Sequence, residues 1–95
     1  MDYPYTEKKT RNDGLQRLFR FKNGFGASAI CHSGSLGGSQ GLWELAFLDK
    51  KGHVTYFNEI SKEPVIGYLS WEAVAPWLDR VADLPENHHN QSFWR

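Results

Sequence analysis

Two turn signals constrain the fold of this chain more than any other feature. Asn23-Gly24 interrupts one run of strand-like residues, and Asp49-Lys50-Lys51-Gly52 interrupts another. Asn and Gly tolerate the positive φ angles that a two-residue hairpin turn requires. Asp in first position and Gly in fourth suit a type I turn followed by a bulge. The sequence therefore predicts two β-hairpins between Phe19 and Phe57, and with them most of a sheet.

The first hairpin has a predicted register. A two-residue turn would place Phe19 opposite Ser28, so that Phe19, Phe21 and Ile30 share one face of the sheet. The opposite face would carry Leu18, Phe25, Ala27, Ala29 and Cys31. Phe21 would then lie opposite Gly26, where its ring can cover the exposed glycine backbone.

The second hairpin is predicted to place Leu48 opposite Val54, Phe47 opposite Thr55 and Leu45 opposite Phe57. Together the two hairpins predict a four-stranded antiparallel meander of residues 16–22, 25–31, 42–48 and 53–57. Residues 65–69 could add a short edge strand.

A single helix follows the strands. Ser70 is a suitable N-cap, because its hydroxyl can accept from a free N–H of the first turn. The apolar residues that recur at helical spacing are Val74, Trp77, Leu78, Val81 and Leu84. Pro76 interrupts this pattern, so the helix either kinks there or begins there, and we favour the kink. The predicted fold class is α+β, with the C-terminal helix packed on the face that bears Trp43, Leu45 and Phe47.

The two ends of the chain read differently from its centre. Residues 1–14 are polar and show no periodic pattern, which predicts a flexible N-terminal arm. Residues 15–85 are predicted to form a single α+β domain, and residues 86–95 a polar C-terminal tail. Tyr3-Pro4-Tyr5 could anchor a partner or the domain's own surface, although a disordered leader is favoured. The tail ends in Phe93-Trp94.

The charge balance narrows the classes of partner. Eleven basic and eleven acidic residues give a formal net charge of zero, which argues against nucleic-acid binding driven by phosphate contacts. Arg17, Arg20 and Lys22 could still serve a nucleic-acid accessory role, or protect a sheet edge from aggregation, which we favour. One cysteine, no signal-peptide core and no apolar run of membrane-spanning length predict a cytoplasmic protein.

The glycine-rich segment 32–41 is a candidate ligand loop. Its backbone N–H groups could hold an anion, with Ser35, Gly37, Gly38 and Trp43 as the candidate residues. It leads into a strand and contains no Lys or Arg, so a flexible connection is the preferred interpretation.

Other candidates for chemistry are weaker. Cys31 and His32 are adjacent on a strand and should point to opposite faces. The four histidines match no metal-site spacing. We therefore expect no enzyme activity, no cofactor and no metal.

The strongest functional signal is an excess of apolar residues. One helix can cover only one face of the sheet, yet the other face would also be apolar, with Leu42, Ala46, Leu48, Val54 and Tyr56. The arm, the tail, a second copy of the chain or a partner protein could cover it. We expect a partner protein or a homodimer.

A set of short segments carries a family resemblance. These are Phe25-Gly26-Ala27-Ser28, Gly37-Gly38, Gly41-Leu42-Trp43-Glu44-Leu45-Ala46, Gly52-His53-Val54-Thr55-Tyr56, Val65-Ile66-Gly67-Tyr68-Leu69 and Glu72-Ala73-Val74. Over residues 21–84 the chain resembles small uncharacterised proteins encoded by bacteriophages and prophages. The resemblance implies a bacterial host cytoplasm and an accessory role, such as modulating a host factor or defence system. It transfers no catalytic residue, and the helix departs from the family pattern at Pro76.

Overall fold

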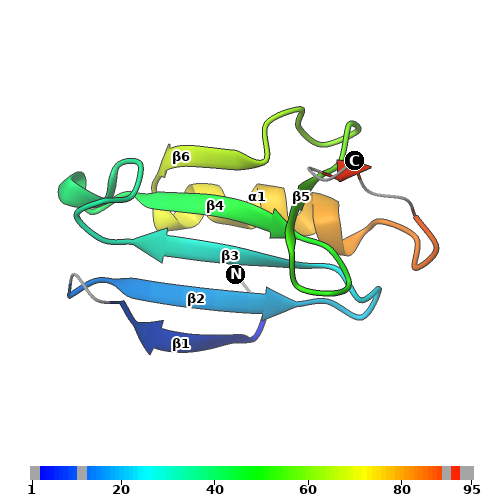
Figure 1. The fold of residues 1–95 in the computed structure, drawn as a ribbon, viewed down its shortest axis with the longest axis horizontal. Helices are drawn as coiled ribbons and strands as arrows, with labels where there is room; N and C mark the ends of the chain where they lie inside the picture. Colours follow the sequence, from blue (N-terminus) through cyan, green and yellow to red (C-terminus); the bar gives the residue numbers. More distant parts are fainter. Residues whose placement is uncertain (1–2, 11–12, 89–90, 93–95) are drawn as a thin grey trace.

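An antiparallel sheet with a helix against one face makes up the structure (Figure 1). The computed structural model describes residues 3–10, 13–88 and 91–92. The helix is α1 (Trp71–Ala82), and a short 3-10 helix, η1, spans Gly38–Gln40. The strands are β1 (Tyr5–Lys9), β2 (Leu15–Arg20), β3 (Gly26–Cys31), β4 (Trp43–Leu48), β5 (Val54–Tyr56), β6 (Val65–Leu69) and β7 (Gln91–Ser92). The α+β class, the antiparallel sheet and the C-terminal helix are confirmed.

The predicted meander is confirmed in its order, but the sheet extends beyond four strands. Its order is β1-β2-β3-β4-β5-β7. The far edge of β4 is shared, because β5 pairs with its C-terminal end and β6 pairs with the part from Trp43 to Ala46. β7, from the predicted tail, pairs with β5. Phe93-Trp94 lies outside the described residues.

Residues 5–9 form the edge strand β1, so the prediction of a flexible arm there is wrong. Two tyrosines account for the difference. The Tyr3 hydroxyl donates to Asp79 Oδ1 at 2.6 Å. The Tyr5 ring lies 5.4 Å from the Phe19 ring and 5.9 Å from the Trp71 ring, centre to centre. These contacts with α1 and β2 favour order, and a reading of local polarity alone does not include them.

The first hairpin forms, but its predicted register is wrong by one residue. Phe19 lies opposite Ala27, not Ser28. Phe21 N–H donates to Phe25 O at 2.8 Å and Gly24 N–H to Phe21 O at 3.0 Å, so the turn holds three residues instead of two. Gly24 takes the left-handed conformation that this turn needs, with φ of 91°. Because side chains alternate along a strand, the shift moves Ile30 away from the face of Phe19.

Asn23 explains the longer turn. Its side chain is 7% exposed, and Nδ2 donates to Val81 O at 2.8 Å and to Leu84 O at 2.9 Å. Oδ1 accepts from Phe25 N–H at 3.0 Å. The last carbonyls of a helix have no partner within the helix. Asn23 therefore acts as a C-terminal cap for α1, supplied from a distant turn.

The second hairpin has the predicted register over the residues that pair. Phe47 lies opposite Thr55 and Leu48 opposite Val54. The turn closes through Gly52 N–H to Asp49 O at 3.0 Å, as the type I prediction requires. The predicted pairing of Leu45 with Phe57 is wrong, because β5 ends at Tyr56 and Leu45 pairs with Ile66 of β6.

α1 is one helix that begins at Trp71 and continues past Pro76. The alternative in which the main helix begins at Pro76 is therefore wrong. The Ser70 hydroxyl accepts from Ala73 N–H at 3.2 Å, which confirms the predicted N-cap.

The core lies between α1 and one face of the sheet. Val74, Leu78 and Val81 are fully buried on the helix. They belong to the same apolar cluster as Trp43, Leu45 and Phe47, so the predicted helix-bearing face is confirmed. Aromatic contacts add to it, with Trp43 and Trp71 ring centres 4.8 Å apart and Phe47 and Trp77 6.3 Å apart.

Substitution of Asn23 tests the cap. Asn23→Asp keeps the shape and the acceptor for Phe25 N–H, but it places a carboxylate against the helix carbonyl oxygens. We expect a loss of about 2–3 kcal/mol in the free energy of unfolding, measured in urea. Asn58→Asp makes the same change at an exposed position and should alter stability by less than about 0.5 kcal/mol. Equal effects of the two variants would refute the cap.

Candidate protein-binding surface

The face of the sheet opposite α1 is not covered by any element of the described chain, and Figure 1 shows α1 behind the sheet with this face toward the viewer. We call it the open face. Register and strand alternation place its apolar residues, which are Leu18, Ile30, Ala46, Leu48, Val54, Tyr56 and Val65. Four of the five residues predicted for a partner face, Ala46, Leu48, Val54 and Tyr56, lie on it. The fifth, Leu42, immediately precedes β4.

The open face is mixed, with polar side chains between its apolar residues. Leu48 is 7% exposed, whereas Val54, which pairs with it from β5, is 39% exposed. Gln16 and Ser28 also lie on this face, and Gln16 Nε2 donates to Ser28 Oγ at 2.9 Å. The surface is therefore apolar in its centre and hydrogen-bonded within itself toward β2, so it is less apolar than predicted.

Leu36, in the glycine-rich loop, extends this surface. Its N–H donates to Glu44 Oε1 at 2.8 Å, and its carbonyl accepts from Tyr68 N–H at 3.1 Å. The Leu36 side chain lies over Gly67, where an added Cβ would come within 2.4 Å of Leu36 Cβ. Even so, Leu36 is 47% exposed. Two hydrogen bonds therefore hold an apolar side chain in place at the surface.

Tyr68 lies beside Leu36 and has an unusual backbone. Its φ is 58°, in the left-handed region that non-glycine residues rarely adopt. The strand pairing shifts between Trp43 and Leu45, so that Gly67 and Tyr68 both lie opposite Glu44, as in a β-bulge. The bulge leaves the Tyr68 side chain 60% exposed. The glycine within this strand is the sequence signal that could have predicted a bulge here.

The predicted ligand-loop residues do not converge on one site. Gly38 N–H donates to Ser35 O at 3.1 Å, and Gly37 O accepts from Leu42 N–H at 2.9 Å. A Cβ on Gly38 would lie 1.8 Å from His32 O, so close packing accounts for that glycine. Trp43 points to the helix-bearing face, next to Trp71. Much of the loop's hydrogen-bonding capacity is thus used within the protein.

Arg17 lies among aromatic rings on the helix-bearing face. Its guanidinium carbon is 5.0, 4.7 and 4.3 Å from the ring centres of Tyr5, Trp43 and Trp71. Its Nε donates to Glu7 Oε1 at 2.8 Å, and its side chain is 19% exposed. Cation–π contacts and an ion pair therefore integrate this charge into the fold.

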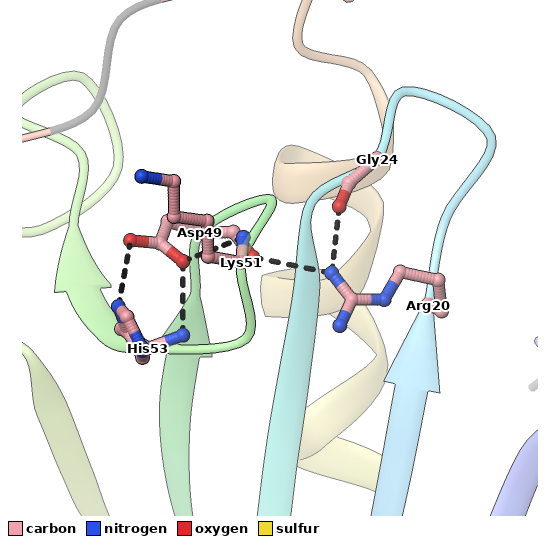
Figure 2. Close-up of polar contacts among 5 residues, drawn as sticks. All are labelled: Arg20, Gly24, Asp49, Lys51 and His53. Atoms are coloured by element: carbon pink, nitrogen blue, oxygen red, sulfur yellow. Dashed lines mark hydrogen bonds and ion pairs between the residues drawn. The ribbon is translucent and has the colours of Figure 1, made fainter.

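Arg20 links the two hairpin turns. Its Nη1 donates to Gly24 O at 2.8 Å and to Asp49 O at 3.1 Å, as Figure 2 shows. In the same view the Asp49 carboxylate accepts from the N–H groups of Lys51 and His53, both at 2.9 Å. Arg17 and Arg20 thus lie on opposite faces of β2, so the basic cluster read from the sequence is divided between two surfaces.

The cysteine and histidines have separate surroundings. Cys31 Sγ contacts Gly38 O at 3.8 Å, whereas His32 Nδ1 accepts from Gly34 N–H at 3.0 Å. His88 Nε2 lies 3.0 Å from Glu59 Oε2. His89 lies outside the described residues. The part of the chain that the structure describes contains no group of three or more His, Cys, Asp or Glu arranged to hold a metal ion.

Comparison with known proteins does not assign a family. No family model, no curated protein and no solved structure matches this chain. Among the described residues, no helix has the length and apolar character needed to cross a membrane. The resemblance to phage-encoded proteins stays a prediction.

The Arg17 contacts can be tested by stability. Arg17→Met keeps much of the apolar stem but removes the charge from the aromatic rings and from Glu7. We expect it to lower the free energy of unfolding by about 1–2 kcal/mol, followed by tryptophan fluorescence in urea. Arg17→Lys keeps the charge without the planar guanidinium, so its stability should lie between that of the wild type and that of Arg17→Met. Wild-type stability in Arg17→Met would contradict the role of the charge.

The position of Leu36 can be tested through Glu44. Glu44→Ala removes the acceptor of the Leu36 N–H, and hydrogen exchange of that amide should accelerate about tenfold, corresponding to roughly 1.4 kcal/mol. Glu44→Gln keeps an acceptor oxygen and should stay closer to wild type. Unchanged exchange in Glu44→Ala would show that Glu44 does not hold the loop.

Proposed function

We propose that this chain is a non-catalytic protein-binding module that acts through the open face together with Leu36 and Tyr68. The observation that carries the proposal is the geometry of Leu36, which is fixed by Glu44 and Tyr68 and yet 47% exposed. Apolar and aromatic side chains that fill a partner's pockets contribute most of the energy at protein interfaces. Fixing such a side chain before binding reduces the entropy lost on association.

The backbone of Tyr68 supports the same surface. A non-glycine residue in the left-handed region costs on the order of 1–3 kcal/mol, and such strain concentrates at binding and catalytic sites. Here the strain accompanies a bulge that turns an aromatic ring outward beside Leu36. The two side chains together extend the apolar centre of the open face.

A second copy of the chain is the first partner that we propose. The open face is apolar over β4 and β5 and becomes polar toward β2, and protein interfaces likewise combine an apolar part with a polar part. The resemblance described above further supports a phage accessory role, in which the module occupies the surface of a host factor or defence protein. The alternatives of a nucleotide-binding loop and of a nucleic-acid accessory protein receive less support, because the loop residues and the arginines do not converge.

Light scattering at several concentrations tests self-association. We expect the wild type to form a dimer, and we expect Leu36→Ser combined with Val54→Ser to shift the equilibrium at least about tenfold toward the monomer. Glu72→Ser, on the exposed side of α1, is the matched control and should behave as wild type.

A pull-down from bacterial lysate, with mass spectrometry, covers the case of a different partner. A protein retained by the wild type and by Glu72→Ser, but lost with the Leu36/Val54 double variant, would support the proposed surface. The proposal is refuted if the wild type is a strict monomer and if it also retains no protein that the Leu36/Val54 double variant loses.

A further inference from the structure

β1 forms one border of the sheet, and its backbone pattern follows from one hydrogen bond. Thr10 N–H donates to Gly14 O at 3.0 Å, so these two residues form a hydrogen-bonded pair. In an antiparallel ladder such pairs alternate with non-bonded ones, which makes Lys8 and Thr6 the next residues bonded to β2. The N–H and C=O groups that point away from the sheet therefore belong to Tyr5, Glu7 and Lys9. Within the described chain no strand pairs with this border.

The border strand is held in place from the helix-bearing side. Tyr5 packs against Phe19 and Trp71, and Glu7 binds Arg17, which is itself stacked on Trp71. A strand fixed in this way needs little further ordering when another strand pairs with it.

The charge near this border is positive. Residues 1–22 contain six basic and three acidic residues, whereas the remainder contains five basic and eight acidic. Lys8 points to the open-face side, and Glu7, on the other side, already has Arg17 as its partner. A cavity of about 250 Å³ opens beside the strand, lined by Pro4, Tyr5, Thr6, Leu18 and Arg20.

We propose that the β1 border binds an acidic, extended peptide by strand addition. The peptide backbone pairs with the outward groups of Tyr5, Glu7 and Lys9, as in other peptide-binding sheets. Side chains of the added strand alternate between the two faces. Acidic residues therefore meet Lys8 on one side, and apolar residues lie beside the exposed Tyr5 ring on the other. This inference does not rest on the proposed function of the open face.

A second copy of β1 fits this border poorly. An antiparallel pair of two copies centred on the strand places Glu7 opposite Glu7. A shift toward either end leaves only residues 7–9 or residues 5–7 of each copy paired, and the first of these shifts places Lys8 opposite Lys8. Like charges directly opposite each other destabilise a ladder. A nucleic acid would match the charge, but it lacks the alternating N–H and C=O groups that the border presents.

The test uses labelled synthetic peptides of about eight residues and the full chain. We expect fluorescence anisotropy to show that a peptide of alternating Val and Glu binds at least about tenfold more tightly than one of alternating Val and Lys. Two further versions of the Val/Glu peptide are N-methylated at alternate amides, one at the Val positions and one at the Glu positions. Only one of these two sets of amides can face β1, so one version should lose the affinity of the parent peptide.

Two variants of one residue separate the backbone from the side chain. Glu7→Pro removes an outward N–H without removing a bond to β2, a position at which edge strands accept proline. Glu7→Ala removes the same side chain but keeps the N–H. We expect Glu7→Pro to bind the Val/Glu peptide at least about tenfold less tightly than Glu7→Ala, and Lys8→Glu to weaken binding severalfold. Circular dichroism checks that each variant is folded.

Hydrogen exchange on the wild type gives an independent readout that needs no variant. Without peptide, the Thr6 and Lys8 amides should exchange more slowly than those of Tyr5, Glu7 and Lys9, and saturating Val/Glu peptide should slow the latter three. Any of three results overturns the proposal. Both N-methylated peptides could bind as tightly as the parent peptide, or a single-stranded oligonucleotide could bind more tightly than the Val/Glu peptide. The third is that the peptide does not slow hydrogen exchange of the Tyr5, Glu7 and Lys9 amides.

Discussion

The hydrogen bonds of Asn23 connect the two halves of the structure. One amide side chain binds carbonyls at the end of α1 and the N–H of Phe25 at the start of β3. Because this residue is nearly buried, its donors would have no water to replace those partners. The turn that accommodates it holds three residues, and that length decides which side chains of β2 and β3 face the helix. The division of the sheet into a core face and an open face thus depends on this contact.

The two faces have different physical roles. The helix-bearing face is filled by aromatic rings and by Arg17, whose charge is stabilised by those rings and by Glu7. On the open face, Leu36 and Tyr68 are held by backbone hydrogen bonds while their side chains meet solvent. Order without burial distinguishes these two residues from the core, where the same contacts that order a side chain also bury it.

Local sequence patterns predicted the elements better than the contacts between them. The Asp49–Gly52 turn, the Ser70 cap and the spacing of Val74, Leu78 and Val81 are all set by neighbours in the chain, and each was predicted correctly. The register of the first hairpin and the strand β1 depend on contacts with α1. Such partners are distant in sequence, so a local pattern contains no record of them. For the candidate surface, the residues of β4 and β5 were predicted, whereas Leu36 and Tyr68 were not.

The hydrogen bond between Tyr3 and Asp79 has a consequence for the order in which the elements become stable during synthesis. Its two residues are 76 positions apart, and Tyr5 likewise packs against Trp71. A ribosome releases Tyr3 and Tyr5 before their partners on α1 are synthesised. β2, β3 and β4 can pair while translation continues, but β1 gains its contacts with α1 only when the helix is complete. β1 is therefore fully stabilised only after β2, β3, β4 and α1 have been made.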